Sequence, residues 1–152
     1  MATTEDVHDW IPLRWRDIDA LGHVYHAEFL TLLDEARTRW FRTVLGLRDP
    51  DSYVLVHVEI DYESPLDLAD GKVRVDFAVE RIGTSSLTLT ETMHAPDGRV
   101  VSRSRSITVR WERPAGRSRA LTDDERERAR AQMDGQPAAE GVSPRSAPRG
   151  GS

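Results

Sequence analysis

The 152-residue sequence contains no cysteine, and this absence excludes several kinds of site. Disulfide bonds, thiolate nucleophiles and cysteine-ligated zinc or iron–sulfur centres all need a thiol. Long apolar runs are also missing: no stretch approaches the roughly 18 apolar residues that a membrane-spanning helix needs. Residues 1–9 are polar and acidic, without the apolar segment of a signal peptide. We therefore expect a cytoplasmic protein without a membrane partner.

An excess of positive charge is missing as well. The 21 Lys and Arg residues are interspersed with 26 Asp and Glu residues, which gives a formal net charge of −5. Proteins that bind nucleic acid or anionic membranes in general carry a basic excess or a basic patch. We expect no nucleic-acid partner, although a local group of arginines could still hold a phosphorylated ligand.

What the sequence does contain is one long amphipathic segment behind a polar turn. From about His26 the apolar residues recur at the spacing of one helix face, and Gly46 supplies a stop. The pattern predicts a helix over residues 27–45, roughly 28 Å long at about 1.5 Å per residue. Residues 19–25, with Gly22 among them, form the expected turn before it, and residues 10–16 alternate as a first strand.

After residue 52 the apolar period changes to two, which predicts strands. The expected turns between these strands contain Gly71, Gly83 and Gly98. The predicted strands cover residues 54–62, 73–79, 87–93 and 99–112.

The last of these strands can be oriented from its side chains. We place Ser102, Ser104 and Ser106 beneath the helix, because small side chains let a helix approach a sheet closely, and Arg103 and Arg105 on the outer face. The order of one strand, one long helix and four further strands predicts an α+β fold, in which one antiparallel sheet wraps around one central helix.

The two ends of the chain have weaker patterns. Residues 122–125 read TDDE, a capping box that opens a short charged helix to about residue 133. Its apolar side is thin, so we expect it to pack weakly. Residues 134–152 contain no aromatic residue and a single valine, and we expect them to be disordered. Residues 1–9 should form a flexible arm, which leaves one domain over residues 10–133.

The polar turn is a candidate site because it leads into a helix start. The first N–H groups of a helix lack partners and carry partial positive charge, so they can stabilise negative charge on a substrate oxygen. Asp19 or Asp17 upstream could act as base or nucleophile, a layout suited to acyl transfer. On spacing alone, the alternative is that both are turn residues and that His23 and His26 are surface groups. These histidines lack the helical presentation of a metal motif, and we expect no metal.

The residues of this segment carry a family resemblance. Residues 17–24 read DIDALGHV, residues 25–29 read YHAEF and residues 34–37 read DEAR. This resembles the opening of the 4-hydroxybenzoyl-CoA thioesterase-like hotdog proteins, which have a D-x-D-x-x-G-H/V-V turn, a central helix and an E-x-A-R motif on it. Many members have Asn-Asn after the valine, whereas Tyr25-His26 is more similar to the YbgC-type acyl-CoA thioesterases. The resemblance covers residues 10–112.

The resemblance implies roles for individual residues. Asp19, the second aspartate of D-x-D, would be the catalytic carboxylate, and the backbone N–H of His26 would polarise the thioester carbonyl. Asp17 is expected to be a turn or strand-end residue. The remaining residues of the turn would bind substrate: Gly22, which the tight backbone requires, with His23, Val24 and Tyr25.

A second segment is similar to the family in the same way. Residues 81–86 resemble its R-x-G-x-S-S segment, which lies beside the ligand in relatives, so Arg81, Thr84, Ser85 and Ser86 would bind substrate. The alternative for this segment is a plain hairpin turn around Gly83.

The resemblance implies an acyl-CoA thioesterase that yields a free acid and CoA, needs no cofactor, and assembles as a homodimer or homotetramer. The alternatives are a thioesterase for acyl carrier protein, a non-hydrolytic acyl-CoA-binding protein, and a dehydratase that uses a histidine with a helix carboxylate. Other hotdog thioesterases carry their acid on the central helix, which makes Glu28, Asp34 and Glu35 rival candidates.

Overall fold

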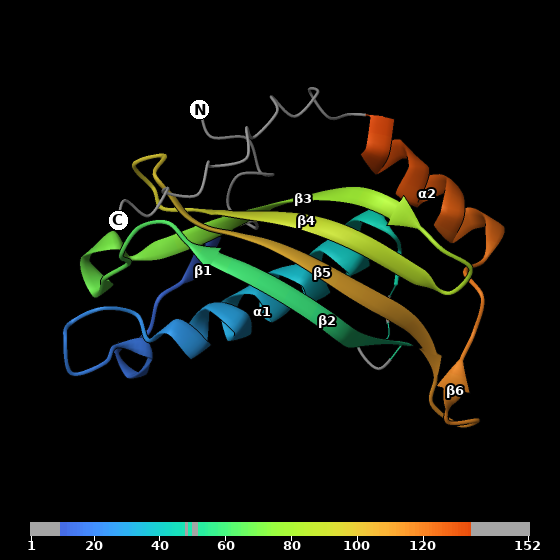
Figure 1. The fold of residues 1–152 in the computed structure, drawn as a ribbon, viewed down its shortest axis with the longest axis horizontal. Helices are drawn as coiled ribbons and strands as arrows, with labels where there is room; N and C mark the ends of the chain where they lie inside the picture. Colours follow the sequence, from blue (N-terminus) through green and yellow to red (C-terminus); the bar gives the residue numbers. More distant parts are fainter. Residues whose placement is uncertain (1–9, 48, 50–51, 135–152) are drawn as a thin grey trace, which may run out of the picture.

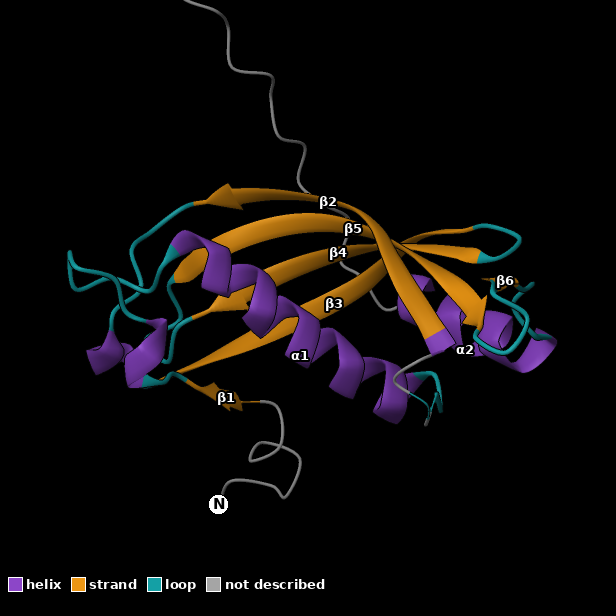
Figure 2. Cartoon of the chain, turned by 90° about the horizontal axis from the view of Figure 1, so that it is seen from below, coloured by secondary structure: helices purple, strands orange, loops and turns teal. Residues whose placement is uncertain are grey.

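One long helix and one curved antiparallel sheet account for most of the residues that the computed structural model describes, which are residues 10–47, 49 and 52–134. Helix α1 (His26–Val44) crosses one face of the sheet (Figure 1, Figure 2). The strands lie in the order β1-β3-β4-β5-β2, and all neighbours are antiparallel. The strand bounds are β1 (Trp10–Pro12), β2 (Tyr53–Tyr62), β3 (Lys72–Ile82), β4 (Ser86–His94), β5 (Val100–Glu112) and β6 (Arg117–Ser118), which pairs with the end of β5. The predicted α+β arrangement, with one sheet wrapped around one helix, is confirmed.

Helix α1 has 19 residues and starts one residue before the predicted range. Several of its apolar residues are buried against the sheet, and Leu33 is 0% exposed, whereas Leu30 is 39% exposed. Two groups of buried apolar side chains result. The first surrounds the beginning of α1 and includes Ile11, Leu33, Val73 and Met93. The second surrounds the end of α1 and includes Phe41 and Leu89.

A buried ion pair joins the helix to the sheet. Nη2 of Arg37 lies 2.7 Å from Oε2 of Glu91 on β4, and both side chains are about as buried as the apolar core. Oγ of Ser104 on β5 donates to the same carboxylate at 3.0 Å. Ser102 and Ser106 are fully buried on the same strand face. The predicted placement of these serines beneath α1 is therefore confirmed.

The prediction of a first strand over residues 10–16 is confirmed for residues 10–12 and wrong for residues 13–16. Strand β1 stops at Pro12, because proline has no backbone N–H for the ladder. The chain then forms a 3₁₀ turn, Trp15–Asp17, in which the Asp17 carboxylate accepts the backbone N–H of Arg14 at 2.8 Å. The N–H of Leu13 still donates to the carbonyl of Gly71 at 2.9 Å, but the ladder with β3 ends at Pro12.

Helix α2 (Asp123–Asp134) lies at the end of the sheet where α1 finishes (Figure 2). Its apolar contact is small, as expected: Ala129 and the preceding Leu121 join the second group of buried apolar side chains. Polar contacts add to this, since the side chain of Arg126 donates to main-chain carbonyls of the β3–β4 turn. The expectation of weak packing took no account of these contacts.

Two further predictions concern the chain ends and membranes. Helix α2 includes Asp134, so the predicted disordered tail begins no earlier than residue 135. Residues 135–152 and the predicted arm of residues 1–9 lie outside the described residues. Among residues 10–134, as far as they are described, neither helix has the length and apolar character needed to cross a membrane.

Candidate functional site

The turn before α1 is closed by its own backbone and by one carboxylate oxygen. The N–H of Asp19 donates to the carbonyl of His23 at 2.8 Å, and the N–H of Gly22 donates to the carbonyl of Asp19 at 3.1 Å. Oδ1 of Asp19 accepts the N–H groups of Leu21 at 2.9 Å and of His23 at 3.2 Å. Gly22 has a φ of 82°, in the left-handed region that favours glycine. The expected turn role of Asp19 is thus present, but it uses one oxygen only.

The two aspartates of the turn are in different situations. Asp17 is 0% exposed, and both of its oxygens accept hydrogen bonds from Arg14. The side-chain bond to Asp17 is the main reason that the pKa of Arg14 is raised. By contrast, Asp19 is partly exposed, and its Oδ2 has no hydrogen bond to any described residue. Only Asp19 has an oxygen available to a ligand.

The start of α1 leaves a backbone donor open. Tyr25 is the residue before the first helical turn and gives no side-chain cap. The two preceding amides are used: Val24 donates to the carbonyl of Leu66, and Tyr25 donates to the carbonyl of Asp17. Within residues 10–47, 49 and 52–134, the N–H of His26 has no acceptor. Together with the helix dipole, this N–H makes the helix start favourable for negative charge.

Asp19 and His26 line the same open pocket of about 340 Å³. Residues of the turn and the helix form one wall, and the segment that follows β2 forms the other. The lining residues are Asp19, His23, Val24, His26, Phe29, Tyr62, Glu63, Ser64, Pro65 and Leu66. The structure therefore brings together the two residues that the sequence predicted as the reacting groups.

Tyr62 is a pocket residue that the sequence analysis missed. Its hydroxyl donates to the main-chain carbonyl of His26 at 2.9 Å, and its ring packs edge-on against Phe29 at a centroid distance of 5.0 Å. Burial raises the pKa of Tyr62, so the hydroxyl keeps its proton. Its position in β2 could have indicated this. Tyr62 follows Ile60 by two residues and so lies on the same strand face, which packs on the core beneath α1.

The rival carboxylates on α1 do not line this pocket. Asp34 pairs with Arg37 at 3.1 Å, and Glu35 pairs with Arg39 at 2.7 Å, one helical turn away. Glu28 is partly exposed in the first turn of α1. Pairing with arginine on the same helix accounts for Asp34 and Glu35 without a catalytic role.

The second predicted binding segment lies far from the first within one chain. Thr84 and Ser85 belong to the β3–β4 turn, and Arg81 of β3 and Ser86 of β4 flank it. This turn lies next to α2, whereas the turn before α1 lies at the opposite end of the sheet (Figure 1). Six residues of β5 lie between the partners of the two ends, since Ser86 pairs with Val109 and Tyr62 pairs with Ser102. The predicted binding residues therefore form two separate groups in one protomer.

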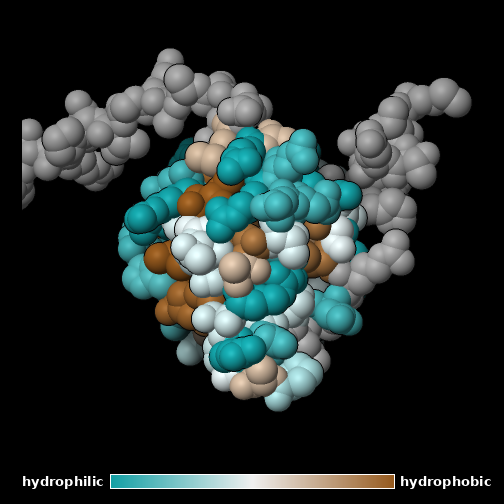
Figure 3. Space-filling view, turned by 90° about the vertical axis from the view of Figure 1, so that its right-hand side faces the viewer, coloured by the Kyte–Doolittle hydropathy of each residue, from teal (hydrophilic) through white to brown (hydrophobic). Residues whose placement is uncertain are grey.

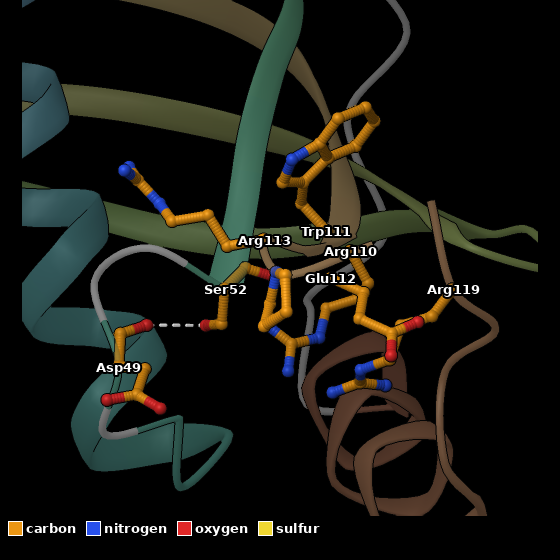
Figure 4. Close-up of a pocket in the computed structure, with 8 residues that line it drawn as sticks. Asp49, Ser52, Arg110, Trp111, Glu112, Arg113 and Arg119 are labelled. Carbon is orange, nitrogen blue, oxygen red and sulfur yellow. Dashed lines mark hydrogen bonds between the residues drawn. The ribbon is translucent and has the colours of Figure 1, made fainter. Parts of the chain in front are cut away.

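A second pocket of about 390 Å³ lies at this α2 end (Figure 4) and contains three arginines. Nη1 of Arg110 donates to the carbonyl of Ser52 at 2.6 Å, and Nη2 lies 3.1 Å from Glu125. Arg119 lies 2.7 Å from the same carboxylate, and Arg113 extends away from both (Figure 4). The other lining residues are Asp49, Trp111, Glu112 and Pro114.

The charges of this second pocket are balanced internally. Burial opposes the ionisation of Glu125, but hydrogen bonds and charge from Arg119 and Arg110 outweigh it, so the pKa of Glu125 is lowered. The surface at this end of the molecule is largely hydrophilic, with small separate hydrophobic spots (Figure 3). Because Arg110 and Arg119 are already engaged, we interpret this pocket as a structural junction between β5 and α2.

The described residues contain no group of three or more His, Cys, Asp or Glu side chains that could hold a metal ion. Asp19, His23 and His26 do not form such a group either. The first pocket offers the unused oxygen of Asp19, the open N–H of His26, the hydroxyl of Tyr62 and two imidazole rings. Its second carboxylate, that of Glu63, is paired with Arg103 at 2.9 Å.

Comparison with protein families gives a match over most of the chain. Residues 13–131 match the model of the thioesterase-like superfamily. No curated protein sequence matches the chain.

Solved structures with the same fold include several thioesterases. A thioesterase from Thermus thermophilus, complexed with coenzyme A and zinc, is 32% identical, with a TM-score of 0.72 over 84% of this chain and 93% of that one. A predicted thioesterase from Bacillus stearothermophilus is 27% identical, with a TM-score of 0.71 over 82% of this chain and 93% of that one. A putative acyl-CoA thioesterase from Xanthomonas campestris is 32% identical, with a TM-score of 0.58 over 66% of this chain and 90% of that one.

Proposed function

Because the chain belongs to the thioesterase-like superfamily of hotdog proteins, we propose that it hydrolyses an acyl-CoA thioester to a free acid and CoA. The observation that carries this proposal is the shared pocket of Asp19 and His26. The turn offers a carboxylate with an unused oxygen, and the helix start beside it offers an unused N–H. These are the two groups that attack on a thioester carbonyl requires.

In the proposed reaction the thioester carbonyl oxygen accepts the N–H of His26. Negative charge develops on this oxygen as the tetrahedral intermediate forms, and a fixed donor at the positive end of a helix stabilises it. Tyr62 supports the geometry, because its bond to the carbonyl of His26 connects the first turn of α1 to the end of β2.

Asp19 acts on the other side of the carbonyl carbon. Its free oxygen either removes a proton from an attacking water molecule or attacks the carbon itself to form a mixed anhydride, which water then hydrolyses. In both routes the bond to sulfur breaks, the thiolate leaves and takes up a proton, and the products are the acid and free CoA. The bonds from Leu21 and His23 to Oδ1 hold the carboxylate in one orientation.

The test is thiol release from a panel of acyl-CoA substrates, measured for the wild-type protein and for Asp19→Asn. Asparagine keeps an oxygen for the turn but cannot act as base or anionic nucleophile, so turnover should fall by about 10²–10⁴-fold. More than about a tenth of wild-type turnover in this variant would exceed that range and reject Asp19. Binding of acyl-CoA without thiol release would favour the non-hydrolytic alternative. Thiol release only from acyl carrier protein would identify acyl carrier protein, not CoA, as the carrier of the substrate.

A homodimer would bring the two groups of binding residues to the same end of the assembly. The outer side of β2, ten residues long, pairs with no other described strand, and Val56 is 56% exposed. Such an open edge favours strand pairing. Two-fold pairing of β2 with its copy is antiparallel, because a two-fold axis reverses strand direction. It would set the Asp19 turn of one protomer at the same end as the β3–β4 turn of its partner.

Sedimentation measures this assembly directly. We expect a dimer, or a tetramer of two dimers, at micromolar concentration. A monomer under these conditions would contradict the proposed pairing of β2.

A further inference from the structure

The β3–β4 turn is held from outside by the C-terminal part of the chain. Three consecutive main-chain carbonyls of the turn, those of residues 83–85, accept hydrogen bonds from it. The N–H of Arg110 donates to Ser85 at 2.8 Å, and the N–H of Leu121 donates to Thr84 at 2.9 Å. Nη2 of Arg126 on α2 donates to Gly83 at 3.0 Å and to Thr84 at 2.9 Å.

These bonds fix the direction of the amides as well. In a planar trans peptide the N–H points opposite to the carbonyl of the same unit. Because the carbonyls of Gly83 and Thr84 face α2, the N–H groups of Thr84 and Ser85 face away from it. Within the described parts of the chain, neither N–H has an acceptor.

The turn also has little freedom to adjust. The N–H of Gly83 donates to the carbonyl of Ser86 at 2.8 Å. A Cβ atom at Gly83 would lie 2.3 Å from Oγ of Ser86. The free N–H groups of Thr84 and Ser85 are consecutive in the chain, and successive N–H groups in a turn can bind anionic oxygens.

We propose that Arg126 is a positioning residue for substrate binding. By holding the carbonyls of Gly83 and Thr84, it keeps the donors of the turn directed toward the phosphate-bearing part of an acyl-CoA. This inference rests on the proposed function, because it takes CoA as the ligand. The inference adds helix α2 to the elements that support substrate binding. This helix lies outside residues 10–112, which carry the family resemblance in the sequence.

The anchoring of α2 makes this role separable from folding. Glu125 joins the start of α2 to Arg110 and Arg119, and Ala129 is 0% exposed in the second group of buried apolar side chains. These contacts remain when Arg126 is replaced. A change at Arg126 should therefore alter the turn more than the attachment of the helix.

The experiment compares Arg126→Gln with Arg126→Lys and with Arg130→Gln as matched control. Arg130 is an exposed arginine of the same helix. The readouts are KM and kcat on the best acyl-CoA of the panel, affinity for coenzyme A by titration calorimetry, melting temperature, and amide hydrogen exchange of residues 81–88.

In Arg126→Gln we expect KM and the dissociation constant of coenzyme A to rise about five- to tenfold, the worth of one hydrogen bond. Exchange at residues 81–88 should become faster, while kcat and melting temperature stay near wild type. Arg126→Lys should recover part of the affinity, and Arg130→Gln should match wild type. A KM within twofold of wild type in Arg126→Gln, or a rise no larger than in Arg130→Gln, would overturn the role of Arg126.

The proposed function can fail separately. If the wild-type protein binds coenzyme A but releases no thiol, weaker binding by Arg126→Gln still supports the positioning role, and only hydrolysis is rejected. If the wild-type protein releases thiol and Arg126→Gln behaves like wild type, only the positioning role is rejected. If it neither binds coenzyme A nor releases thiol, both are rejected.

Discussion

The two ends of the sheet use their polar groups in opposite ways. Where α1 begins, Asp19 has an unused oxygen and His26 has an unused N–H, and both line a pocket. Where α2 lies, the carboxylate of Glu125 is surrounded by Arg110 and Arg119 and also closes the capping box with Thr122. Groups without partners can react or bind, whereas groups with partners hold elements together. The Asp19 turn should therefore control turnover, and the junction around Glu125 should control stability.

Of the substitutions that compare the two ends, Glu125→Ala should have the largest effect on stability. Glu125→Ala leaves the guanidinium of Arg110, which is 6% exposed, without its carboxylate. Removing one partner of a buried ion pair costs about 3–5 kcal/mol, which urea unfolding would measure. The matched control is Glu112→Ala at the same end, because the pair of Glu112 with Arg117 is exposed and worth at most about 1 kcal/mol.

The pH dependence checks the same carboxylate. The pKa of Glu125 is lowered from 4.5, so its contribution to stability is present above that value and is lost as the pH falls through the folded-state pKa. Wild type and Glu125→Ala should therefore differ most near neutral pH and converge in acid. A loss of stability in Glu125→Ala no greater than in Glu112→Ala would contradict the proposed junction between β5 and α2.

Asp17 and Asp19, two residues apart in the sequence, show the same difference between a group with partners and a group without. Asp17→Asn replaces a buried carboxylate oxygen by an amide that cannot accept from Arg14, and we expect a loss of about 1–3 kcal/mol. Turnover per folded molecule should change little, because both oxygens of Asp17 are engaged with Arg14. Unfolding and thiol-release assays on Asp17→Asn and Asp19→Asn would separate the roles. Loss of turnover in both variants, with stability unchanged, would remove the distinction.

Much of the fold was predictable because periodicity reports which face of an element is buried. The spacing of apolar residues predicted α1 to within one residue, and alternation predicted the face of β5 that carries Ser104. Periodicity cannot show which polar groups meet across the core. Arg37 and Glu91 are 54 residues apart in sequence, and no local pattern joins them. Their pairing follows from how α1 crosses the sheet.

The sequence also predicted the part of the candidate site that comes from one continuous segment, but not the part that comes from elsewhere in the chain. Asp19 and His26 belong to one continuous motif and line one pocket. Tyr62 was missed because it reaches the site from a strand 36 residues away. The burial of Asp17 was missed as well, because it depends on β1 ending at Pro12 and on the turn that follows.

The smallest expected effect on stability, and the sharpest test of the comparison, comes from two glycines. Gly22 in the Asp19 turn and Gly98 in the β4–β5 hairpin have φ values of 82° and 86°. A Cβ at either would meet no atom within 4 Å. Replacement by alanine therefore costs backbone strain alone, about 1–2 kcal/mol at each site. The unfolding free energies of Gly22→Ala and Gly98→Ala should fall by similar amounts.

Their activities should differ, because only Gly22 shapes the turn that orients Asp19. If alanine shifts this turn, the carboxylate moves relative to the N–H of His26, and misplacement by about 1 Å can cost up to a hundredfold in rate. Gly98→Ala should keep wild-type turnover under conditions where both variants are folded. Equal turnover in the two variants would mean that the Asp19 turn tolerates displacement, and the reacting carboxylate would then have to be sought on α1, starting with Glu28.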